Sequence, residues 1–224
     1  LPSQSLCPPL PVAAAHLAIL LAVRPPLRQL RRHLRAPESY PLLLLYLACT
    51  WPWMPQSYGV PRLSLVDVGL QLLLADLAGY LAHRLEHAYP GLYRRTHTAH
   101  HRIRDPTLLD AYQGSVADTA MLILLPLQCT AWLLWAAGRA VHLWSFALFG
   151  ALYSSHLLLI HHPGARRYHA VGRSLGLVTY QDHHLHHRQR HVNFGHIFTL
   201  WDRLGGTYRC RPTLKSSINN VGPG

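Results

Sequence analysis

The chain has 224 residues, 50% of them hydrophobic and only 13% charged, with 21 basic residues against nine acidic ones and a formal net charge of +12. This composition excludes an ordinary soluble globular protein and favours a single-domain integral membrane protein. The arginines lie between long apolar runs, as cytosolic charges do in membrane proteins, so the basic charge does not indicate a nucleic-acid partner. Four scattered cysteines form no CxxC pair and predict no disulfide framework.

The first elements predicted along the chain are an apolar run and a basic loop. Residues 10–23 are apolar but too few to cross a bilayer of roughly 30 Å, which needs about 20 helical residues. They form either a truncated span or an interfacial helix. Residues 24–35 carry five arginines, and the positive-inside rule places such a segment in the cytosol.

Four later apolar runs predict two helical hairpins. Residues 40–54 are rich in leucine and end at two tryptophans typical of a membrane interface, and residues 63–82 lead back to the first histidines. The runs 118–137 and 141–160 are separated by a joint so short that it predicts an antiparallel pair. The expected fold is therefore an all-α integral membrane protein with about four transmembrane helices in two hairpins and a cytosolic helical cap.

Three histidine motifs follow the predicted spans or lie in the cap. HRLEH holds two histidines at i and i+4, and HTAHH and HHLHH both repeat the spacing HxxHH. On a helix this spacing projects imidazoles from one face. Two hairpins that start from a cytosolic loop place all three motifs on the cytosolic side. The predicted metal ligands in these motifs are His83, His87, His97, His100, His101, His183, His186 and His187.

The number of histidines predicts a dinuclear metal site. Neutral imidazole is the commonest protein ligand for divalent transition metals, and eight or more imidazoles exceed the four ligands of one tetrahedral zinc ion. Two irons with open positions suit O2 activation, although the sequence does not distinguish iron from zinc. Such a site needs one or two further ligands, and spacing alone does not choose among His156, His161, His162 and His169. A single HxxHH could equally be a surface tract that scavenges metal.

Asp76 is an ionisable residue in an otherwise apolar span, where such residues are costly and usually functional. Asp76, Tyr80, His83 and His87 lie at i, i+4, i+7 and i+11, along one helical stripe. We expect the Asp76 carboxylate to accept a hydrogen bond from the non-ligating nitrogen of a metal-bound histidine. The alternative is a helix-packing carboxylate paired with an arginine. Glu86 lies off this stripe and is expected in solvent.

The region from His83 to Tyr208 resembles the sterol desaturase/fatty acid hydroxylase superfamily of integral membrane proteins. The resemblance rests on HRLEH, LYRRTHTAHH, DHHLHH and NFGHIFTLWDRLGGTYR in this order, and it covers about the C-terminal two-thirds of the chain. We expect a family domain over 41–212, after the short apolar element and basic loop of 1–40. Residues 213–224 are polar and rich in glycine, serine and asparagine, which predicts a flexible tail.

This resemblance implies a non-haem di-iron oxidoreductase of the endoplasmic reticulum with its metal site on the cytosolic side. Such enzymes use O2 and electrons, commonly from cytochrome b5, to hydroxylate or desaturate a sterol, sphingoid or acyl chain, and the final motif leans slightly toward the sterol desaturases. The family places a further ligand before the last histidine box, with His162 as the best match, His161 as the next and His156 as a weaker choice. Asp202 in WDRL matches a family position and either supports the metal site or caps a turn. The resemblance implies no catalytic residue beyond the ligands.

Two alternatives remain at this stage. A catalytically inactive relative could keep every histidine box for folding and act as a membrane scaffold. A histidine-rich metal transporter would need polar residues along its spans, and the second hairpin carries almost none between Met121 and Ser154. The loop arginines could dock an acidic electron donor or anionic lipid headgroups.

Overall fold

A computed structural model describes residues 9–39, 41–42, 45 and 60–210, and this part of the chain is helical. Among these residues, the β-pairing consists of an isolated antiparallel bridge between Leu177 and Phe198. The helical elements are α1 (Pro9–Val23), α2 (Leu27–Arg35), α4 (Leu65–Ala88), α5 (Pro90–Arg95), α6 (Thr98–His101), η3 (Leu108–Tyr112), α7 (Val116–Thr119), η4 (Ala120–Leu124), α8 (Leu125–Ala136), α9 (Leu143–His161), η5 (Pro163–Tyr168), α10 (His169–Ser174), α11 (Tyr180–Gln189) and α12 (Leu200–Leu204).

Three helices are long and apolar enough to cross a membrane: α4, the continuous helix Val116–Ala136 formed by α7, η4 and α8, and α9. They correspond to the predicted runs 63–82, 118–137 and 141–160. The first two begin at serine caps, where Ser64 accepts from the Asp67 N–H and Ser115 from the Asp118 N–H. Most of the fourth predicted span, residues 40–54, and the tail from 213 lie outside the described residues.

The helix Val116–Ala136 contains one π-helical turn at η4. Pro126 follows this turn and has no N–H to donate, and the Leu125 N–H donates to the Ala120 carbonyl five residues back. A π-turn shifts the side chains that follow it relative to a regular helix and is frequent at functional sites. Here it brings Leu122 and Ile123 to the wall of a cavity.

The turn between α8 and α9 is as short as the sequence predicts. Gly138 has a φ of 68°, in the left-handed region that glycine adopts without steric cost. The next residue, Arg139, forms an ion pair with Asp67 near the start of α4, with 2.8 Å between Nη2 and Oδ1. This charge pair lies at the end of the spans opposite the histidines.

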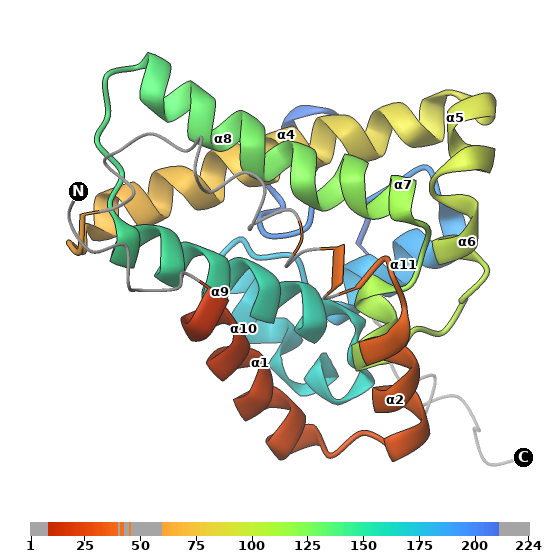
Figure 1. Cartoon of the computed structure of the whole chain (residues 1–224). Helices are drawn as coiled ribbons and strands as arrows, with labels where there is room; N and C mark the ends of the chain where they lie inside the picture. Colours follow the sequence, from red (N-terminus) through yellow and green to blue (C-terminus); the bar gives the residue numbers. More distant parts are fainter. Residues whose placement is uncertain (1–8, 40, 43–44, 46–59, 211–224) are drawn as a thin grey trace, which may run out of the picture.

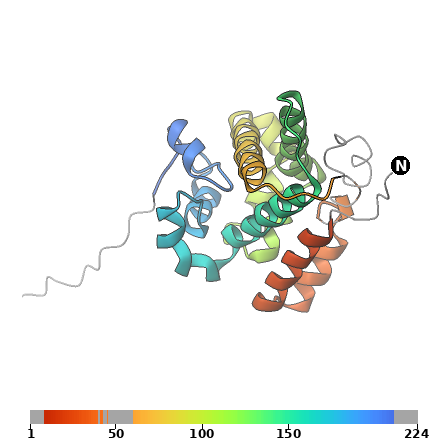
Figure 2. The same ribbon diagram turned by 90° about the vertical axis from the view of Figure 1, so that its left-hand side faces the viewer.

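Helix α4 contacts both α8 and α9, and the shared core includes Ala75, Ala131, Phe149 and Tyr153. Helix α1 lies along α9, which gives the short apolar run 10–23 a partner within the protein (Figure 1). Figure 2 shows α10 to α12 on the opposite side of the three spanning helices from α1 and α2. The spans therefore separate an N-terminal layer, formed by α1 and α2, from a C-terminal layer, formed by α10 to α12.

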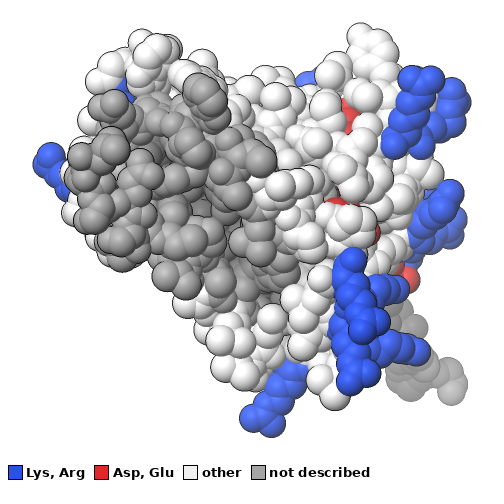
Figure 3. All heavy atoms as spheres, viewed as in Figure 1, with Lys and Arg blue, Asp and Glu red and all other residues white. Residues whose placement is uncertain are grey.

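Basic side chains gather at one end of the molecule on the face seen in Figure 3, where α2, α5 and α6 lie. The described surface over the middle of the spans carries little charge in this view. The loop from α5 to α6, the last turn of α9 and all of α11 also lie toward this basic end (Figure 1). All three histidine motifs are therefore brought to the same end of the spanning helices, as the hairpin parity predicts.

Candidate metal centre

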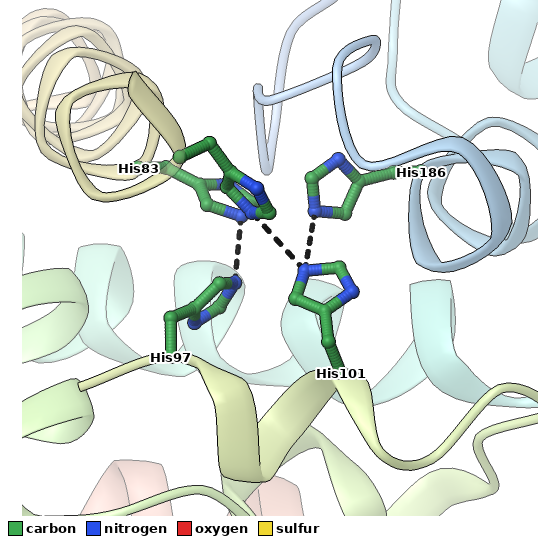
Figure 4. Close-up of side chains that lie close together, drawn as sticks. His83, His97, His101 and His186 are labelled. Carbon is green, nitrogen blue, oxygen red and sulfur yellow. Dashed lines mark hydrogen bonds between the residues drawn. The ribbon is translucent and has the colours of Figure 1, made fainter. Parts of the chain in front are cut away.

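Five histidines from three elements form what we call the first histidine group: His83, His87, His97, His101 and His186. One ring nitrogen of each lies within 4.8 Å of the corresponding nitrogen of every other member. The Nε2 atoms of His83 and His97 are 2.9 Å apart, and those of His186 and His101 are 3.0 Å apart. Figure 4 shows these four rings turned toward a common centre from α4, α6 and α11.

Four more histidines form the second histidine group: His100, His161, His183 and His187. Their ring nitrogens also lie within 4.8 Å of one another, and all four residues are buried. The Nε2 atom of His183 is 2.9 Å from that of His161 and 3.2 Å from that of His187. The two groups are neighbours, because the ring centroids of His101 and His187 are 4.9 Å apart.

The HxxHH motif divides its histidines between the two groups. In HTAHH, His97 and His101 belong to the first group and His100 to the second. In HHLHH the assignment is reversed, because His183 and His187 belong to the second group and His186 to the first. On a helix, positions i and i+4 point nearly the same way, whereas i+3 lies about 100° from i+4. Each motif therefore supplies both groups and holds them side by side.

Hydrogen bonds on the outer side of the rings determine which nitrogens face inward as acceptors. The Nδ1–H of His83 donates to the Phe194 carbonyl at 2.8 Å, and that of His97 donates to Asp118 Oδ1 at 2.7 Å. A neutral imidazole carries one N–H, so the Nε2 atoms of both rings present lone pairs. Two lone pairs 2.9 Å apart repel unless a cation lies between them. Two nitrogens bound at about 2.1 Å and at right angles to one metal ion would be about 3.0 Å apart, so this donor set fits a transition metal.

Burial keeps the rings neutral, which is the form that binds metals. It lowers the pKa of His97, His183, His186 and His187 well below the usual 6.5, and neighbouring imidazoles lower the pKa further. A proton shared between facing rings is therefore disfavoured at neutral pH. A metal ion is the remaining cation that the geometry accommodates.

Two buried carboxylates lie behind the first histidine group. Asp118 of α7 accepts from His97 Nδ1, as described above, and Glu86 Oε2 lies 3.8 Å from the same nitrogen. A carboxylate bonded to the second nitrogen of a ligand fixes its tautomer and increases its basicity. The expected solvent exposure of Glu86 is wrong, because this face of α4 packs against His97 and Thr96.

The Asp76 carboxylate accepts hydrogen bonds from backbone N–H groups, whereas the sequence predicted a hydrogen bond from a histidine ring. Its Oδ1 accepts from the N–H groups of His196 and Ile197 at 3.0 and 2.8 Å, and its Oδ2 accepts from the Phe198 N–H at 2.8 Å. Asp202 acts similarly, accepting from the N–H groups of Phe194 and Gly195. The Phe194 carbonyl in turn accepts the hydrogen bond from the His83 ring. Asp76 and Asp202 therefore position the site indirectly, through the loop between α11 and α12.

At the end of α9, the histidine that joins a group is not the one that the family resemblance favours. His161, the second choice, lies in the second group, while His162 caps the helix with its ring partly exposed and outside both groups. The Nε2–H of His156 donates to the Val178 carbonyl at 3.0 Å, outside the groups. His169 contacts Thr179.

The structure adds residues that the sequence analysis did not single out. His196 is buried, its ring is stacked on that of His83 with 5.1 Å between centroids, and burial lowers its pKa to about 4. Its position in the NFGH motif was the sequence signal that could have identified it. His184, inside HHLHH, points away from both groups toward Asp105, at 2.8 Å.

A cavity of about 30 Å³ adjoins both histidine groups. Histidines from both groups line it, together with Asp118 and Thr119 and with apolar side chains from three elements: Ala111 of η3, Leu122 and Ile123 of η4, and Leu157 of α9. This volume corresponds to about two water-sized spheres, enough for a diatomic molecule such as O2. The site therefore combines imidazole nitrogens with a wall that is apolar in part.

Comparison with known proteins agrees with this geometry. A profile of the fatty acid hydroxylase family matches residues 68–207, which include both histidine groups. The chain therefore belongs to the fatty acid hydroxylase family, within the sterol desaturase/fatty acid hydroxylase superfamily of membrane lipid oxidoreductases.

Three relatives show the range of activities among similar proteins. The chain is 40% identical over 182 residues to the alternative squalene epoxidase of Phaeodactylum tricornutum, covering 79% of this chain and 51% of that protein. It is 29% identical to the cholesterol 25-hydroxylase of Rattus norvegicus, covering 79% and 58% of the two chains. It is 26% identical to the Delta(7)-sterol 5(6)-desaturase of Saccharomyces cerevisiae, covering 69% and 39%. The chain thus spans roughly half the length of these relatives. No solved structure matches the chain significantly.

Proposed function

We propose that this protein binds two iron ions, one in each histidine group, and oxidises a membrane lipid with O2. The proposed ligands are His83, His87, His97, His101 and His186 for one ion and His100, His161, His183 and His187 for the other. The bound ions would supply the redox chemistry that directs O2 to a C–H or C=C bond. Zinc could occupy the same nitrogens after purification.

The observation that carries this proposal is the convergence of inward-facing Nε2 lone pairs in two adjacent buried groups, beside a small cavity with apolar side chains in its wall. The chain's own contribution is to hold the ligands in one geometry and to exclude water. The outer hydrogen bonds of His83 and His97 orient their rings, and Leu122 and Leu157 keep the cavity wall apolar. A lipid reaching this site would come from the bilayer that surrounds α4, α8 and α9.

The relatives support a lipid substrate. Those described above are named for acting on squalene, cholesterol and a sterol, so we propose a sterol or a sterol precursor. Hydroxylation and desaturation are both compatible with the site. Epoxidation of a squalene-like alkene is a second candidate, supported by the 40% identity over most of this chain.

We place the protein in the endoplasmic reticulum, with the histidine end in the cytosol. The concentration of arginines at that end supports this orientation through the positive-inside rule. Reduction of O2 also needs electrons, and the same basic end suits an acidic donor such as a cytochrome b5-type protein.

The direct experiment is expression in a sterol-producing host under ¹⁸O2, followed by comparison of the extracted lipids. Hydroxylation or epoxidation adds one labelled oxygen, and acid hydrolysis to a diol distinguishes the epoxide. Desaturation instead removes two hydrogens without adding oxygen. His101→Ala should abolish the new product, whereas His184→Ala, from the same kind of motif but outside both groups, should retain it. An unchanged lipid profile from folded, iron-loaded wild-type protein supplied with an electron donor would favour the scaffold alternative.

A further inference from the structure

An exposed apolar surface lies on the C-terminal layer, away from the metal centre. We call it the cap face and define it by Tyr168, Val171, Leu175, Leu200 and Leu204, whose side chains lie on or beside η5, α10 and α12. Their exposed fractions are 55, 61, 66, 40 and 73%, respectively. Exposing five such side chains to water would be costly, which calls for a partner that covers them.

Backbone pairing joins the two halves of the cap face. The Thr199 N–H donates to the Gly176 carbonyl at 2.8 Å, and the Val178 N–H donates to the Ile197 carbonyl at 2.8 Å. Leu175 and Leu200 directly flank the Gly176–Thr199 contact. The exposed side chains of α10 and α12 therefore lie next to one another on the protein surface.

The loop before α12 contacts α4 far from the cytosolic end of that helix. Asp76, which accepts three N–H groups of this loop, lies 12 residues, or about 18 Å, before Ala88 at a rise of 1.5 Å per residue. It is only nine residues, or about 14 Å, from Asp67, whose ion pair with Arg139 marks the other end of the span. If the hydrocarbon core is about 30 Å thick, the loop therefore reaches well inside it.

The backbone N–H groups of this loop are hydrogen-bonded within the protein, as a water-free environment requires. Six consecutive N–H groups, from Phe194 to Thr199, all have acceptors within the protein. Five of the six donate to the buried carboxylates of Asp202 and Asp76. Non-helical backbone occurs at membrane depth only where protein groups satisfy it in this way.

The surroundings of the cap face are basic. Arg167 lies over the Tyr168 ring, with 4.8 Å from Cζ to the centroid, and Arg203 lies over the Tyr208 ring at 4.4 Å. Arginines whose stems lie along apolar surface can extend their guanidinium groups to anionic headgroups. An apolar face bordered by arginine and tyrosine is typical of a membrane interface.

We propose that α10, α12 and the loop before α12 are inserted into the cytosolic leaflet, with the cap face in contact with lipid acyl chains. The C-terminal layer is then a re-entrant part of the membrane domain, and the predicted purely cytosolic cap is restricted to the basic end with α5 and α6. The C-terminal layer adjoins the spans, because Gly205, directly after α12, lies against the Tyr80 hydroxyl and the Arg84 guanidinium of α4. This inference concerns the placement of the chain in the bilayer and holds whatever reaction the centre performs.

The test uses bimane fluorophores on single cysteines in the full chain, after replacement of Cys7, Cys49, Cys129 and Cys210 by serine or alanine. Leu175→Cys and Leu204→Cys probe the cap face. Leu152→Cys in the middle of α9 is the lipid-exposed control, and Arg104→Cys in the loop after α6 is the aqueous control. Each variant is reconstituted in nanodiscs of phosphatidylcholine with or without bromine on the acyl chains, and iodide is the quencher in water.

Brominated lipid should quench Leu175→Cys and Leu204→Cys to the same extent as Leu152→Cys, while iodide should quench only Arg104→Cys. Quenching of both cap-face probes by iodide at the level of Arg104→Cys would overturn the proposal. Protection from both quenchers would also overturn it and would indicate that a second copy of the chain covers this face. If either variant elutes as an aggregate, Val171→Cys provides a third probe of the same surface.

Discussion

The two histidine groups are built from the same motifs but are supported differently. In the first group, a ring nitrogen of His97 donates to the Asp118 carboxylate, with Glu86 3.8 Å away. In the second group, Nδ1 of His100 donates to the Gln113 carbonyl and that of His161 to the Leu157 carbonyl, both at 2.7 Å. A carboxyl group therefore supports a ring of the first group, whereas backbone carbonyls support these two rings of the second. Because a carboxyl group bonded to a ligand increases its basicity, we expect the two proposed metal positions to differ in affinity, with the first binding more tightly.

The largest effects should come from removing one ligand from each group. We expect His83→Ala and His183→Ala each to reduce turnover by more than about 100-fold, since even changes behind a ligand cost about 10- to 100-fold. Each variant should lose metal mainly from its own group, which metal analysis of the purified protein would measure. His184→Ala is the matched control. Wild-type turnover in either ligand variant would remove that residue from the ligand set.

A comparison of adjacent residues tests the composition of the second group. His161→Ala should lose metal and activity, whereas His162→Ala should keep both, because only the first of these rings faces His183. Metal content and product formation are measured in parallel on the two proteins. The opposite pattern would restore the ligand order that the family resemblance favours.

Asp118→Asn tests the contribution of the carboxyl group to the first histidine group. We expect metal affinity at the first group to fall about 10- to 100-fold while the second group is nearly unaffected, because only His97 loses its carboxylate partner. Competition with a metal-binding dye would resolve the two affinities. Asp105→Asn, which removes an exposed carboxylate bonded to His184, is the control. Equal weakening at both positions would contradict the asymmetry.

Asp76→Asn should separate support of the loop from binding of metal. The variant weakens three hydrogen bonds to a charged group, and we expect a loss of roughly 2 kcal/mol or more in stability. The protein that remains folded should keep its full metal content. Thermal denaturation in detergent and metal analysis give the two readouts. Selective loss of metal at unchanged stability would instead support a direct role beside a ligand.

The smallest effect concerns His33, a buried histidine in neither group. Burial lowers its pKa to about 4, while the nearby Asp110 acts in the opposite direction. Because an unfolded histidine has a pKa near 6.5, the unfolded chain binds a proton that the folded one does not, and stability should fall between pH 6.5 and 4. Hydrogen exchange of α2 in apoprotein, at pH 5 and 7.5, measures this effect. His33→Phe should reduce the pH dependence, and an unchanged dependence would show that other groups cause it.

The sequence was sufficient to predict the helical membrane fold and most of the converging histidines, because both depend on local periodicity. Spacing within HTAHH and HHLHH shows which rings share a face, but it does not show that each motif contributes to both histidine groups. The role of Asp118 was not predicted, because its contact with His97 joins residues of separate elements. Asp76 was recognised as unusual from its apolar surroundings. Its actual partners, backbone N–H groups about 120 residues later, depend on tertiary packing and carry no side-chain signature.

The choice between His161 and His162 shows a related limit. The two residues are identical and adjacent, and only the point at which α9 ends decides which ring faces His183. Glu86 was misjudged for a similar reason, since the face of α4 off the predicted stripe packs against Thr96 and His97.

The most direct test of a two-metal centre is the metal content per chain of detergent-purified protein from iron-sufficient cells, combined with Mössbauer spectroscopy. The proposed function predicts two irons per chain in two different environments, corresponding to the first and second histidine groups. A folded protein that binds no metal, or a single zinc, would contradict the account.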